Sequence, residues 1–440
     1  MNTPVYDYLM EYVHRDDLRM HMPGHKGKGL DGWLGAAYPL DITEICGADS
    51  LYEADGIIAE SERNAAALFG AGATLYSAGG STLCIQAMLM QMKREGRTIL
   101  AGRNAHRSFL NACILLDLPI RWMYARDGAL LSGVISPQAV QYALANSPKP
   151  ACVYLTTPDY LGGVADIEAI ARICQRAGAR LLVDNAHGAH LAFFPQSLHP
   201  IALGADFCCD SYHKFLPALT GAACLHCKNA EDAAALRSAM AMFGSTSPSY
   251  LILASMDLCN RYLANRVRHD VFSVAQRIHR LRKKLKTAFK ISEGDPFHIC
   301  IHAASSGLSG TALAQWLTAH GVMYEYADED YVVLLCSPCT PLSDLERLEQ
   351  VLCACDLPRT QIDQQPAKAP LLYAEMTPRE AALLPCEQVP VHQCIGRICA
   401  MTQPPCPPAV PIVICGEQLN ATAAALLERY GIREITVVKA

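Results

Sequence analysis

Long hydrophobic runs are absent from this 440-residue sequence, and no apolar stretch approaches the ~18 residues that cross a bilayer. An excess of basic charge is also absent, because 37 lysines and arginines stand against 42 aspartates and glutamates. That balance argues against general binding of nucleic acid or of an acidic membrane surface. The first residues lack the basic and apolar regions of a secretory signal, so we expect a cytoplasmic protein.

Cysteine, in contrast, is abundant, with 20 residues. Without an export signal, we interpret them as reduced thiols rather than disulfides. Cys208-Cys209 and Cys353-Ala-Cys355 are not paired C-x-x-C motifs. The C-terminal set is too loosely spaced for a structural zinc ion: Cys386, Cys394, Cys399, Cys406 and Cys415. We therefore predict no metal site and expect most cysteines to act as small core residues.

Short apolar runs alternate with longer segments of helical pattern from about Leu68 to Leu225. The runs are apolar throughout, which is typical of strands buried on both faces. They are Thr98–Ala101, Ile120–Tyr124, Cys152–Thr156, Arg180–Val183, Ala205–Cys209 and Ala222–Leu225. Ile167–Gln175 is a typical helix between them, since Asp166 is a suitable N-cap and Gly178 ends it. This alternation predicts an α/β domain with a mainly parallel sheet.

The rest of the chain predicts two smaller units. A helical stretch runs from Pro248 to Lys286, and a polar linker covers residues 358–370. The elements expected beyond the first stretch are strands at Phe297–His302, Tyr331–Leu335 and Ile412–Cys415, and helices at Thr311–His320 and Leu342–Ala354. The proline-rich stretch Pro404–Pro411 leads into the last of these strands. We therefore place domain boundaries at 1–265, a small α+β domain at 266–358, and a C-terminal α+β domain at 371–440.

A lysine follows one of the buried runs, in the segment Asp210-Ser-Tyr-His-Lys-Phe-Leu-Pro217. Lys214 therefore lies just beyond the end of a strand, where open parallel sheets bind ligands. A lysine in that position can form a Schiff base with an aldehyde cofactor. The alternative is an ordinary surface lysine.

A carboxylate ends another of these runs, at Asp184. A buried aspartate needs a cationic partner to remain ionised, and the protonated ring nitrogen of pyridoxal phosphate (PLP) would serve. Two alternatives stay open. Asp184 caps the next turn, or it forms a metal site with His187 and His190, because the three lie at intervals of three residues.

A glycine-rich turn, Ser77-Ala-Gly-Gly-Ser-Thr82, precedes the helical run Leu83–Arg94. Small residues let backbone N–H groups approach an anion, and the N-terminus of a helix favours its charge. The hydroxyls of Ser81 and Thr82 add donors, so the turn suits one phosphate. It is neither a Walker A loop nor G-x-G-x-x-G, and an ordinary turn is the alternative.

A histidine, His106, lies at a strand-to-helix junction in Arg103-Asn-Ala-His-Arg-Ser108. Its imidazole can stack on a planar ring, and a partly buried histidine without such a role is the alternative. The four features occur in the order phosphate loop, stacking histidine, aspartate and lysine. A fold type I PLP enzyme presents the same order.

Seven segments carry a more specific likeness: Arg19-Met-His-Met-Pro-Gly-His-Lys26, Pro39-Leu-Asp-Ile-Thr-Glu44, Asp210–Thr220, Thr246-Ser-Pro-Ser-Tyr250, Thr377-Pro-Arg-Glu-Ala381, Gly396-Arg397 and Pro404–Pro411. With these segments, the sequence resembles the Orn/Lys/Arg decarboxylases of fold type I over nearly its whole length. The resemblance implies a PLP-binding large domain followed by the two smaller α+β domains. It also implies PLP as cofactor and a homodimer with the active site at the subunit interface.

Residue roles follow from the resemblance. Lys214 would carry PLP as a Schiff base, Asp184 would pair with the ring nitrogen, and His106 would stack on the ring. Thr246 and Ser247 would serve the neighbouring subunit's site, and the segment His25-Lys26 would help to close it. The remaining cofactor contacts would be Gly80, Ser81, Thr82, Ser211 and His213 at the phosphate, and His187 near the ring substituents.

Two departures from the family pattern stand out. Ala78-Gly79-Gly80-Ser81 occupies the position where members often carry Asn-Gly-Ser/Thr, which keeps the N–H groups but removes a side-chain amide. Ala409 lies in the proline-rich turn where Gly-Ile is usual. The Pro-Gly-His-Lys signature begins at Pro23, without the N-terminal wing of longer members, so we expect a dimer or a small multiple of one.

The resemblance implies decarboxylation of arginine, lysine or ornithine to the corresponding amine in polyamine-related metabolism. Lys214 or His213 would return a proton to Cα. Short members suggest arginine, and the acidic run Glu325–Asp330 is either a partner for the distal cation of the substrate or a solvated turn. The alternatives are an aminotransferase or β-eliminating lyase on the same fold, and a PLP-binding scaffold without turnover.

Overall fold

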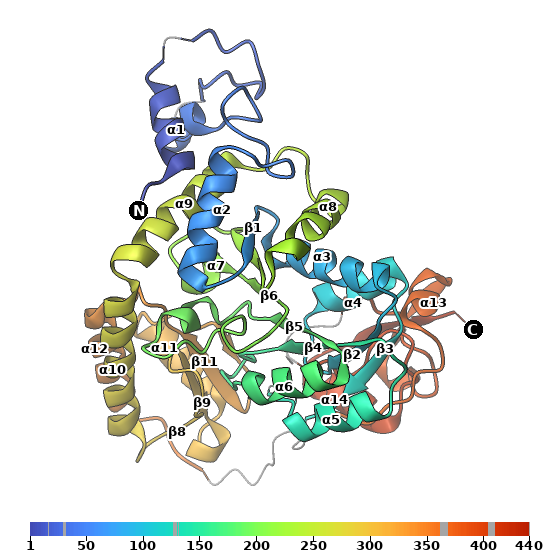
Figure 1. Cartoon of the computed structure of the whole chain (residues 1–440). Helices are drawn as coiled ribbons and strands as arrows, with labels where there is room; N and C mark the ends of the chain where they lie inside the picture. The colour runs from blue at the N-terminus through green and yellow to red at the C-terminus, as the bar shows by residue number, and fades with distance from the viewer. Residues whose placement is uncertain are drawn as a thin grey trace. The chain divides into compact units, whose positions relative to one another are not determined.

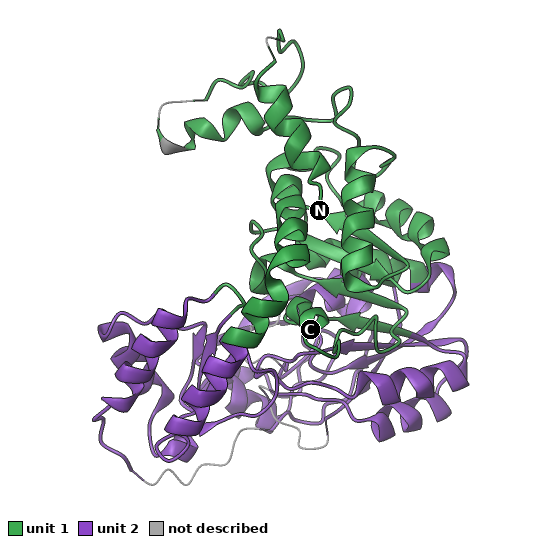
Figure 2. Ribbon diagram, turned by 60° about the vertical axis from the view of Figure 1, so that its left-hand side comes forward, with its two compact units in different colours: residues 1–91, 181–273, 337–339 green, residues 92–180, 274–336, 340–440 purple. Residues whose placement is uncertain are grey.

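The computed structural model describes residues 1–15, 17–29, 32–125, 130, 132–360, 368–403 and 410–439. The chain divides into two compact units, shown in Figure 2. Unit 1 comprises residues 1–91, 181–273 and 337–339, and unit 2 comprises residues 92–180, 274–336 and 340–440. Unit 1 contains the predicted site residues of three features: the glycine-rich turn (Gly80, Ser81, Thr82), Asp184, and the lysine motif (Ser211, His213, Lys214). His106 belongs to unit 2.

Unit 1 contains four strands in the order β1, β7, β6 and β5. Their bounds are Ala73–Ser77 (β1), Ala223–Cys227 (β7), Phe207–Asp210 (β6) and Arg180–Asp184 (β5). Strands β5 and β6 are parallel, whereas β7 runs antiparallel to both of its neighbours. All residues of β6 and β7 are buried, which explains why these stretches are apolar throughout rather than alternating.

The helices of unit 1 begin with an N-terminal arm, α1, drawn dark blue in Figure 1. Thr3 precedes α1 and Pro4 is its first residue, and the carboxylate of Asp257 accepts the early N–H groups of Val5 and Tyr6 at 2.9 and 3.1 Å. The helices are Pro4–Val13 (α1), Ile57–Phe69 (α2), Gly80–Arg94 (α3), Tyr212–Phe215 (α7), Ala233–Phe243 (α8), Tyr250–Asn265 (α9) and the start of Val267–Leu285 (α10). The helical stretch expected from Pro248 to Lys286 is confirmed and consists of two helices, because Arg266 departs from helical dihedral angles.

Unit 2 contains three parallel strands in the order β4, β2 and β3. Their bounds are Ala151–Thr156 (β4), Thr98–Gly102 (β2) and Ile120–Met123 (β3), and the helices among them are Arg107–Leu116 (α4), Pro137–Ala145 (α5) and Ile167–Ala177 (α6). The expected ends of α6 are confirmed. Asp166 accepts the N–H of Ala169 at 3.0 Å, and Gly178 ends the helix with φ 66°.

A second sheet in unit 2 has the order β10, β11, β9 and β8, and all of its pairs are antiparallel. The bounds are Lys290–Ile291 (β8), His298–His302 (β9), Tyr326–Ala327 (β10) and Tyr331–Leu335 (β11), with helices Gly310–Ala319 (α11) and Leu342–Cys353 (α12). Strands β9 and β11 and helices α11 and α12 match the predicted elements to within one residue at each end. The sequence analysis does not predict the two-residue strands β8 and β10.

The C-terminal segment, residues 368–403 and 410–439, has a small core to which Leu130 also contributes. It contains the antiparallel strands Cys386–Pro390 (β12) and Glu434–Val438 (β13) and the helices Pro378–Leu383 (α13) and Ala421–Arg429 (α14). Thr377 and Glu380 form a capping box at α13. Most of the proline-rich stretch Pro404–Pro411 lies outside the described residues, namely residues 404–409 with Ala409 among them.

The strand expected at Ile412–Cys415 is wrong. The four residues are buried but form bends and a turn, in which Glu417 accepts the N–H of Ile414 at 2.8 Å through its side chain. That local hydrogen bond replaces a strand ladder. The apolar run therefore indicated burial correctly and secondary structure incorrectly.

The expected fold class is confirmed. Unit 1 and unit 2 hold the strands predicted between Thr98 and Leu225, each within two residues of its expected start. Of the 20 cysteines, 19 lie in described residues and are free thiols. Among the helices that the structure describes, none combines the length and apolar character that crossing a bilayer requires.

Candidate active site

Lys214 lies on the short helix α7, four residues beyond Asp210, the last residue of β6. Its side chain is exposed, and its Nζ lies 2.9 Å from Nε2 of His187. Since the ammonium group has only protons to donate, the short contact requires a lone pair on that nitrogen of His187 when Lys214 is charged. Two residues that the sequence analysis selected are thus in direct contact.

The glycine-rich turn runs into the first turn of α3, which begins at Gly80, three residues earlier than the apolar pattern alone predicts. Ser77 closes the turn: its Oγ accepts from the N–H of Gly79 at 3.1 Å and donates to the carbonyl of Gly80 at 2.9 Å. Gly80 has φ 68°, a conformation that favours glycine, and no atom lies within 4 Å of the position that a Cβ would take. The early N–H groups of α3 have no acceptor within the helix itself.

This turn and the lysine motif meet through their hydroxyls. Ser211 Oγ donates to Ser81 Oγ at 3.1 Å, which joins β6 to the start of α3. A cavity of about 210 Å³ in unit 1 is lined by Thr82 and Ser247 together with Gly79, Tyr52 and neighbouring residues. Unit 1 therefore brings Ser81, Thr82 and Ser211 to the same end of its strands.

Asp184 is the last residue of β5 and is only 2% exposed. One carboxylate oxygen accepts the N–H of Ala186 at 3.2 Å, so the residue also caps the turn that follows, as one alternative expected. The metal alternative fails on geometry. Among the described residues, the ligand atoms close enough to share an ion belong to His199, Cys208 and Asp210, and not to Asp184 with His187 and His190.

Asp210, at the end of β6, is the centre of a buried cluster that the sequence analysis did not single out. Its oxygens contact Asn185 Nδ2 at 2.7 Å, His199 Nε2 at 3.0 Å and His226 Nε2 at 3.3 Å, all fully buried. Burial alone would raise the pKa of Asp210, but the charges and hydrogen bonds of the two histidines hold that pKa well below its usual range. Burial lowers the pKa of His226, and Asp210 opposes that change.

The cluster explains how two motifs keep their register. Asn185 follows Asp184 directly, and its backbone N–H also donates to the carbonyl of Cys209 at 2.9 Å. Asp210 precedes Ser211 and Lys214. One buried carboxylate therefore ties the end of the strand that carries Asp184 to the start of the loop that carries the lysine. His199, Cys208 and Asp210, whose ligand atoms lie close together, contact one another directly. These contacts explain why the three side chains lie close together.

His213 points its Nδ1 at the carbonyl of Ala222, at 2.9 Å. Because a carbonyl only accepts, that nitrogen carries the proton, and Nε2 of the neutral ring is left with a lone pair. His213 can therefore donate from Nε2 only as an imidazolium. His190 is fully buried against the ring of Phe215, with ring centroids 4.8 Å apart, so it packs in the core.

His106 lies at a strand-to-helix junction, as expected, and is the N-cap of α4. Its Nδ1 accepts the N–H of Ser108 at 3.2 Å and contacts Ser108 Oγ at 2.7 Å, which leaves the proton of the neutral ring on Nε2. The ring is exposed, while Arg103, Asn104 and Ala105 before it are buried.

The acidic run Glu325–Asp330 is engaged within unit 2. Asp328 accepts the N–H of Tyr331 at 2.7 Å and the hydroxyl of Tyr326 at 2.6 Å, and Asp330 pairs with Arg429 of α14 at 2.6 Å. Glu329 accepts from Ser309 and Thr311. The three carboxylates therefore hold their own turn and its neighbours, which favours the structural reading of this run.

The remaining predicted residues lie on exposed or partly exposed loops of unit 1. His25 pairs with Asp41 at 3.2 Å and contacts the ring of Tyr38, and Lys26 donates to the carbonyl of His21. Thr246 and Ser247 are exposed in the loop before α9.

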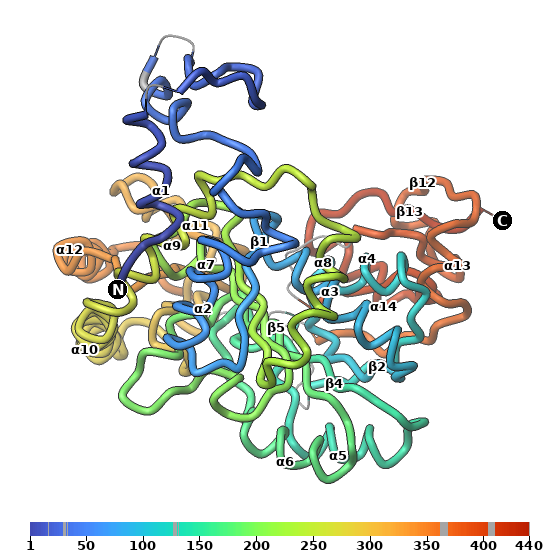
Figure 3. Tube along the Cα trace, turned by 45° about the horizontal axis from the view of Figure 1, so that its top comes forward, coloured from blue at the N-terminus to red at the C-terminus, as the bar shows by residue number. Residues whose placement is uncertain are grey.

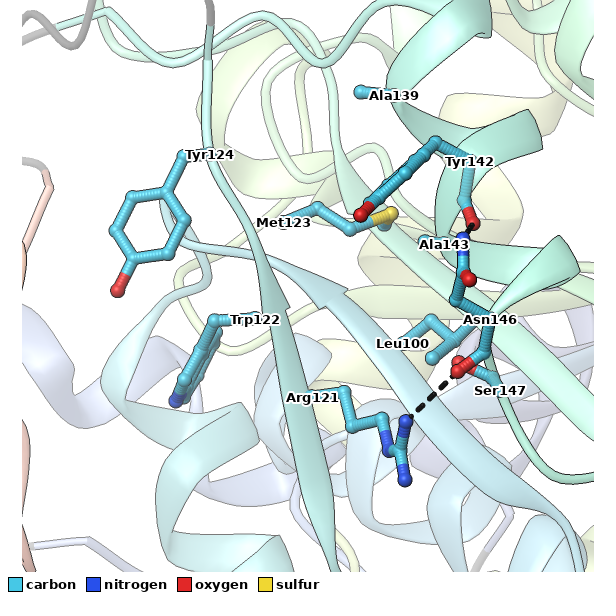
Figure 4. A pocket seen from close by; sticks show the side chains of 10 residues that line it. All are labelled: Leu100, Arg121, Trp122, Met123, Tyr124, Ala139, Tyr142, Ala143, Asn146 and Ser147. Atoms are coloured by element: carbon cyan, nitrogen blue, oxygen red, sulfur yellow. Dashed lines mark hydrogen bonds between the residues drawn. The ribbon is translucent and has the colours of Figure 1, made fainter. Parts of the chain in front are cut away.

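The larger cavity, about 370 Å³, lies in unit 2 along the edge strand β3 and α5, and Figure 4 shows its lining. Arg121 donates across it to the carbonyl of Asn146 at 3.0 Å, and Tyr142 and Met123 stand beside that pair. None of the residues selected from the sequence lines this cavity.

Comparison with known proteins gives consistent results. Residues 3–303 match the family model described as Orn/Lys/Arg decarboxylase, major domain, and residues 361–430 match its C-terminal domain. An arginine decarboxylase of Bacillus subtilis is 29% identical, over 94% of this chain and 91% of the relative.

Two solved structures resemble the fold. The lysine decarboxylase LdcF of Francisella novicida superposes with a TM-score of 0.82 at 17% identity, over 99% of this chain and 81% of that one. A variant serine palmitoyltransferase of S. paucimobilis, solved with a bound PLP–myriocin aldimine, has a TM-score of 0.54 at 15% identity, over 67% of this chain and 75% of that one.

Proposed function

Because the chain belongs to the Orn/Lys/Arg decarboxylase family and is thus an amino-acid decarboxylase, a lyase, we propose that it removes the α-carboxylate of a basic L-amino acid with PLP as cofactor. We propose L-arginine as the substrate, supported by the relative named arginine decarboxylase. The observation that carries the proposal is Lys214, exposed at the end of β6 and 2.9 Å from His187, beside the Ser211–Ser81 contact.

The residues present in unit 1 fit PLP in kind. The amine of Lys214 suits the aldehyde, the hydroxyls of Ser81, Thr82 and Ser211 with the start of α3 suit the phosphate, and buried Asp184 suits the ring nitrogen. When bound, PLP supplies an electron sink for the electron pair that remains at Cα after CO₂ leaves. A neighbour of the same fold was solved with PLP, which supports the choice of cofactor.

The chain's own residues have separate tasks in this proposal. Asp184 holds a proton on the ring nitrogen, since a buried carboxylate is stabilised by a cation beside it. His106 stacks on the ring, and His213 is a further contact of the phosphate. Lys214 returns the proton to Cα. The hydrogen bonds support Lys214 over His213 here, because neutral His213 has its proton on Nδ1, committed to Ala222.

The assembly and setting are also proposals. We propose a homodimer in which Thr246 and Ser247 contribute to the neighbouring subunit's site, with Gly80 and His187 as further cofactor contacts. We propose that the enzyme is cytoplasmic and that its amine product enters polyamine-related metabolism. Family resemblance supports these statements.

The test is CO₂ release from purified, PLP-loaded protein with L-arginine, L-lysine and L-ornithine in turn. We expect release with L-arginine, and we expect Lys214→Ala to reduce it by at least about a thousandfold, on the order of 4 kcal/mol of barrier. The variant should also lose the visible absorbance of lysine-bound PLP. Lys228→Ala, an exposed lysine just after β7, is the matched control and should behave as the parent.

The other outcomes separate the alternatives. Keto-acid formation without CO₂ release would indicate an aminotransferase. Bound PLP without turnover of any of the three amino acids would indicate a scaffold. Unchanged cofactor absorbance in Lys214→Ala would refute the assignment of the lysine itself.

A further inference from the structure

The C-terminal segment contacts α4, the helix that has His106 as its N-cap. Figures 1 and 3 both show α13, near the C-terminus, beside α4. The contacts lie within unit 2, and they hold α4 at both ends and along one side. This arrangement gives the C-terminal segment a role that its own sequence does not indicate.

The first contact is a buried ion pair. Arg103, three residues before His106, donates through both terminal nitrogens to the carboxylate of Glu417, with Nη2 2.7 Å from Oε2. Arg103 is 2% exposed and Glu417 is 3% exposed. A bidentate guanidinium–carboxylate pair fixes orientation as well as distance, so Glu417 fixes the side chain of Arg103.

Arg103 is enclosed on its other sides. The guanidinium carbon lies 5.6 Å from the ring centroids of both Trp122 and Tyr124, and the backbone N–H donates to the carbonyl of Met123 at 2.9 Å. Glu417 is itself held by the N–H of Ile414 at 2.8 Å. The pair therefore has little freedom to move apart from its two backbones.

The second and third contacts act on α4. Ile414 packs against Leu110 and Ile114 in one apolar cluster. At the far end, Arg379 of α13 donates to the carbonyls of Ile114 and Leu115 at 2.8 and 2.9 Å, in the last turn of the helix, where carbonyls have no partner within the helix.

The position of His106 depends on these parts. Its ring nitrogen caps α4 through Ser108, so the ring is tied to the first turn of that helix. The loop behind it is buried, and Asn104 donates to the carbonyl of Thr156 at 3.2 Å. A shift of α4 or of Arg103 would therefore move the exposed ring.

We propose that Glu417 of the C-terminal segment is a positioning residue for the reaction. Through Arg103 and the contacts on α4, it holds His106 in the orientation that stacks on the cofactor ring. The proposal rests on the proposed function only for the role of His106. The dependence of the α4 start on Glu417 is a property of the chain without cofactor.

The first experiment measures that dependence directly, by hydrogen exchange on the full-length protein without PLP. Glu417→Gln keeps the size of the side chain and removes its charge. We expect the amides of residues 103–116 to exchange at least about tenfold faster. The matched control is Glu387→Gln, which breaks an ion pair with Arg397 elsewhere in the same segment and should leave those amides unchanged.

The second experiment is a double-mutant cycle on the PLP-loaded enzyme. A displacement of about 1 Å can lower a rate about a hundredfold, so we expect Glu417→Gln to lower kcat by roughly that factor and to reduce the visible circular dichroism of bound PLP. KM should change less than kcat. In a His106→Ala background, the same substitution should lower kcat by less than about twofold, because the group it positions is already gone.

Each result decides one statement. Unchanged exchange in Glu417→Gln, or an undiminished loss of kcat in the His106→Ala background, would overturn the positioning role. If His106→Ala alone leaves the dichroism and kcat at parent values, the assigned role of His106 fails instead, whatever the exchange shows. Should Glu417→Gln not fold, Glu417→Asp keeps the charge but shortens the reach, and the same readouts apply.

Discussion

Two loops of this chain carry chemistry-bearing residues, and each is held by a buried carboxylate, but the sources of those carboxylates differ. The loop of Lys214 is held by Asp210, four residues away, whose partners Asn185, His199 and His226 come from the same unit and from within 25 residues. The loop of His106 is held by Glu417, 314 residues beyond Arg103.

The two loops differ in which parts of the chain must fold before their buried carboxylate contacts can form. The Asp210 cluster combines residues in or beside β5, β6 and β7 with His199, which lies in the loop between β5 and β6, so all of it belongs to unit 1. The Arg103–Glu417 pair forms only when the C-terminal segment has folded onto unit 2's strands and α4. The two carboxylates also differ in their cations: Asp210 faces two histidines, whereas Glu417 faces an arginine, whose charge is permanent.

The largest expected effect comes from removing Asp210. Asp210→Ala leaves Asn185, His199 and His226 buried around a space without an acceptor. Loss of this buried carboxylate should reduce the free energy of unfolding, measured by urea titration, by about 3–5 kcal/mol. Asp210→Asn should cost less, because its amide can donate to His199 once that ring shifts its proton to Nδ1. Equal losses in the two variants would contradict the role given to the hydrogen bonds.

The second test compares single and double replacements of the distant pair. Arg103→Met alone or Glu417→Met alone leaves one charge buried and should cost about 3–5 kcal/mol of unfolding free energy. The double variant buries no charge, and we expect it within about 2 kcal/mol of the parent. Its kcat should stay low, since apolar packing does not replace the directional hydrogen bonds that hold the loop before His106. Recovery of kcat with stability would show that the pair acts only on folding.

A third test uses the sign of a pH dependence. Asp257 is buried with neutral partners, the N–H groups of Val5 and Tyr6 and the hydroxyl of Ser61, and burial raises the pKa of its carboxyl to about 6. The folded chain then binds this proton more tightly than the unfolded chain, so stability from Asp257 falls as pH rises from about 4 to about 6.

The expected change is on the order of 2 kcal/mol, measured as the difference in unfolding free energy between the parent and Asp257→Asn over that window. For Asp210 we expect the opposite pH dependence of the unfolding free energy, because the pKa of its carboxyl is lowered in the folded chain. Its contribution is complete above the pKa of the unfolded carboxyl, about 4, and is lost as pH falls below that value. Difference curves of the same sign for the two residues would contradict the comparison.

The smallest expected effect concerns the far end of α4. Arg379→Ala removes two donors from the last carbonyls of that helix and should lower the unfolding free energy by about 1 kcal/mol. Arg172→Ala, which breaks an exposed pair with Glu168 on α6, is the control and should stay within about 0.5 kcal/mol of the parent. If Arg172→Ala lowers the unfolding free energy as much as Arg379→Ala does, Arg379 does not stabilise the end of α4 specifically.

Much of the candidate site could be predicted because its signals are local. Asp184 ends one apolar run and Lys214 follows the end of another, and the ends of such runs are the ends of buried strands. His106 precedes an apolar helix, and Ser81 and Thr82 begin another. Local propensity, burial and capping agree at these positions, so the sequence alone indicated the elements and the residues at their ends.

Other features had no local signal. Glu417 follows a short turn, and nothing in its neighbours indicates Arg103 as a partner. Ile412–Cys415 has the composition of a strand but forms a buried turn, because Glu417 supplies the hydrogen bond that a strand would need. The acidic run near Asp330 offered a partner for a substrate cation, yet its ion pair with Arg429 of α14 depends on where that helix packs.

The sequence by itself determined the fold class, the family and the residue types that the chemistry needs, since periodicity, strand ends and motifs depend on neighbours along the chain. Only the tertiary structure decided which carboxylate holds which loop. Buried charges require partners that satisfy both distance and geometry, and chain folding, not sequence separation, sets those distances. For Asp210 the partners lie within 25 residues, and for Arg103 the partner lies 314 residues away.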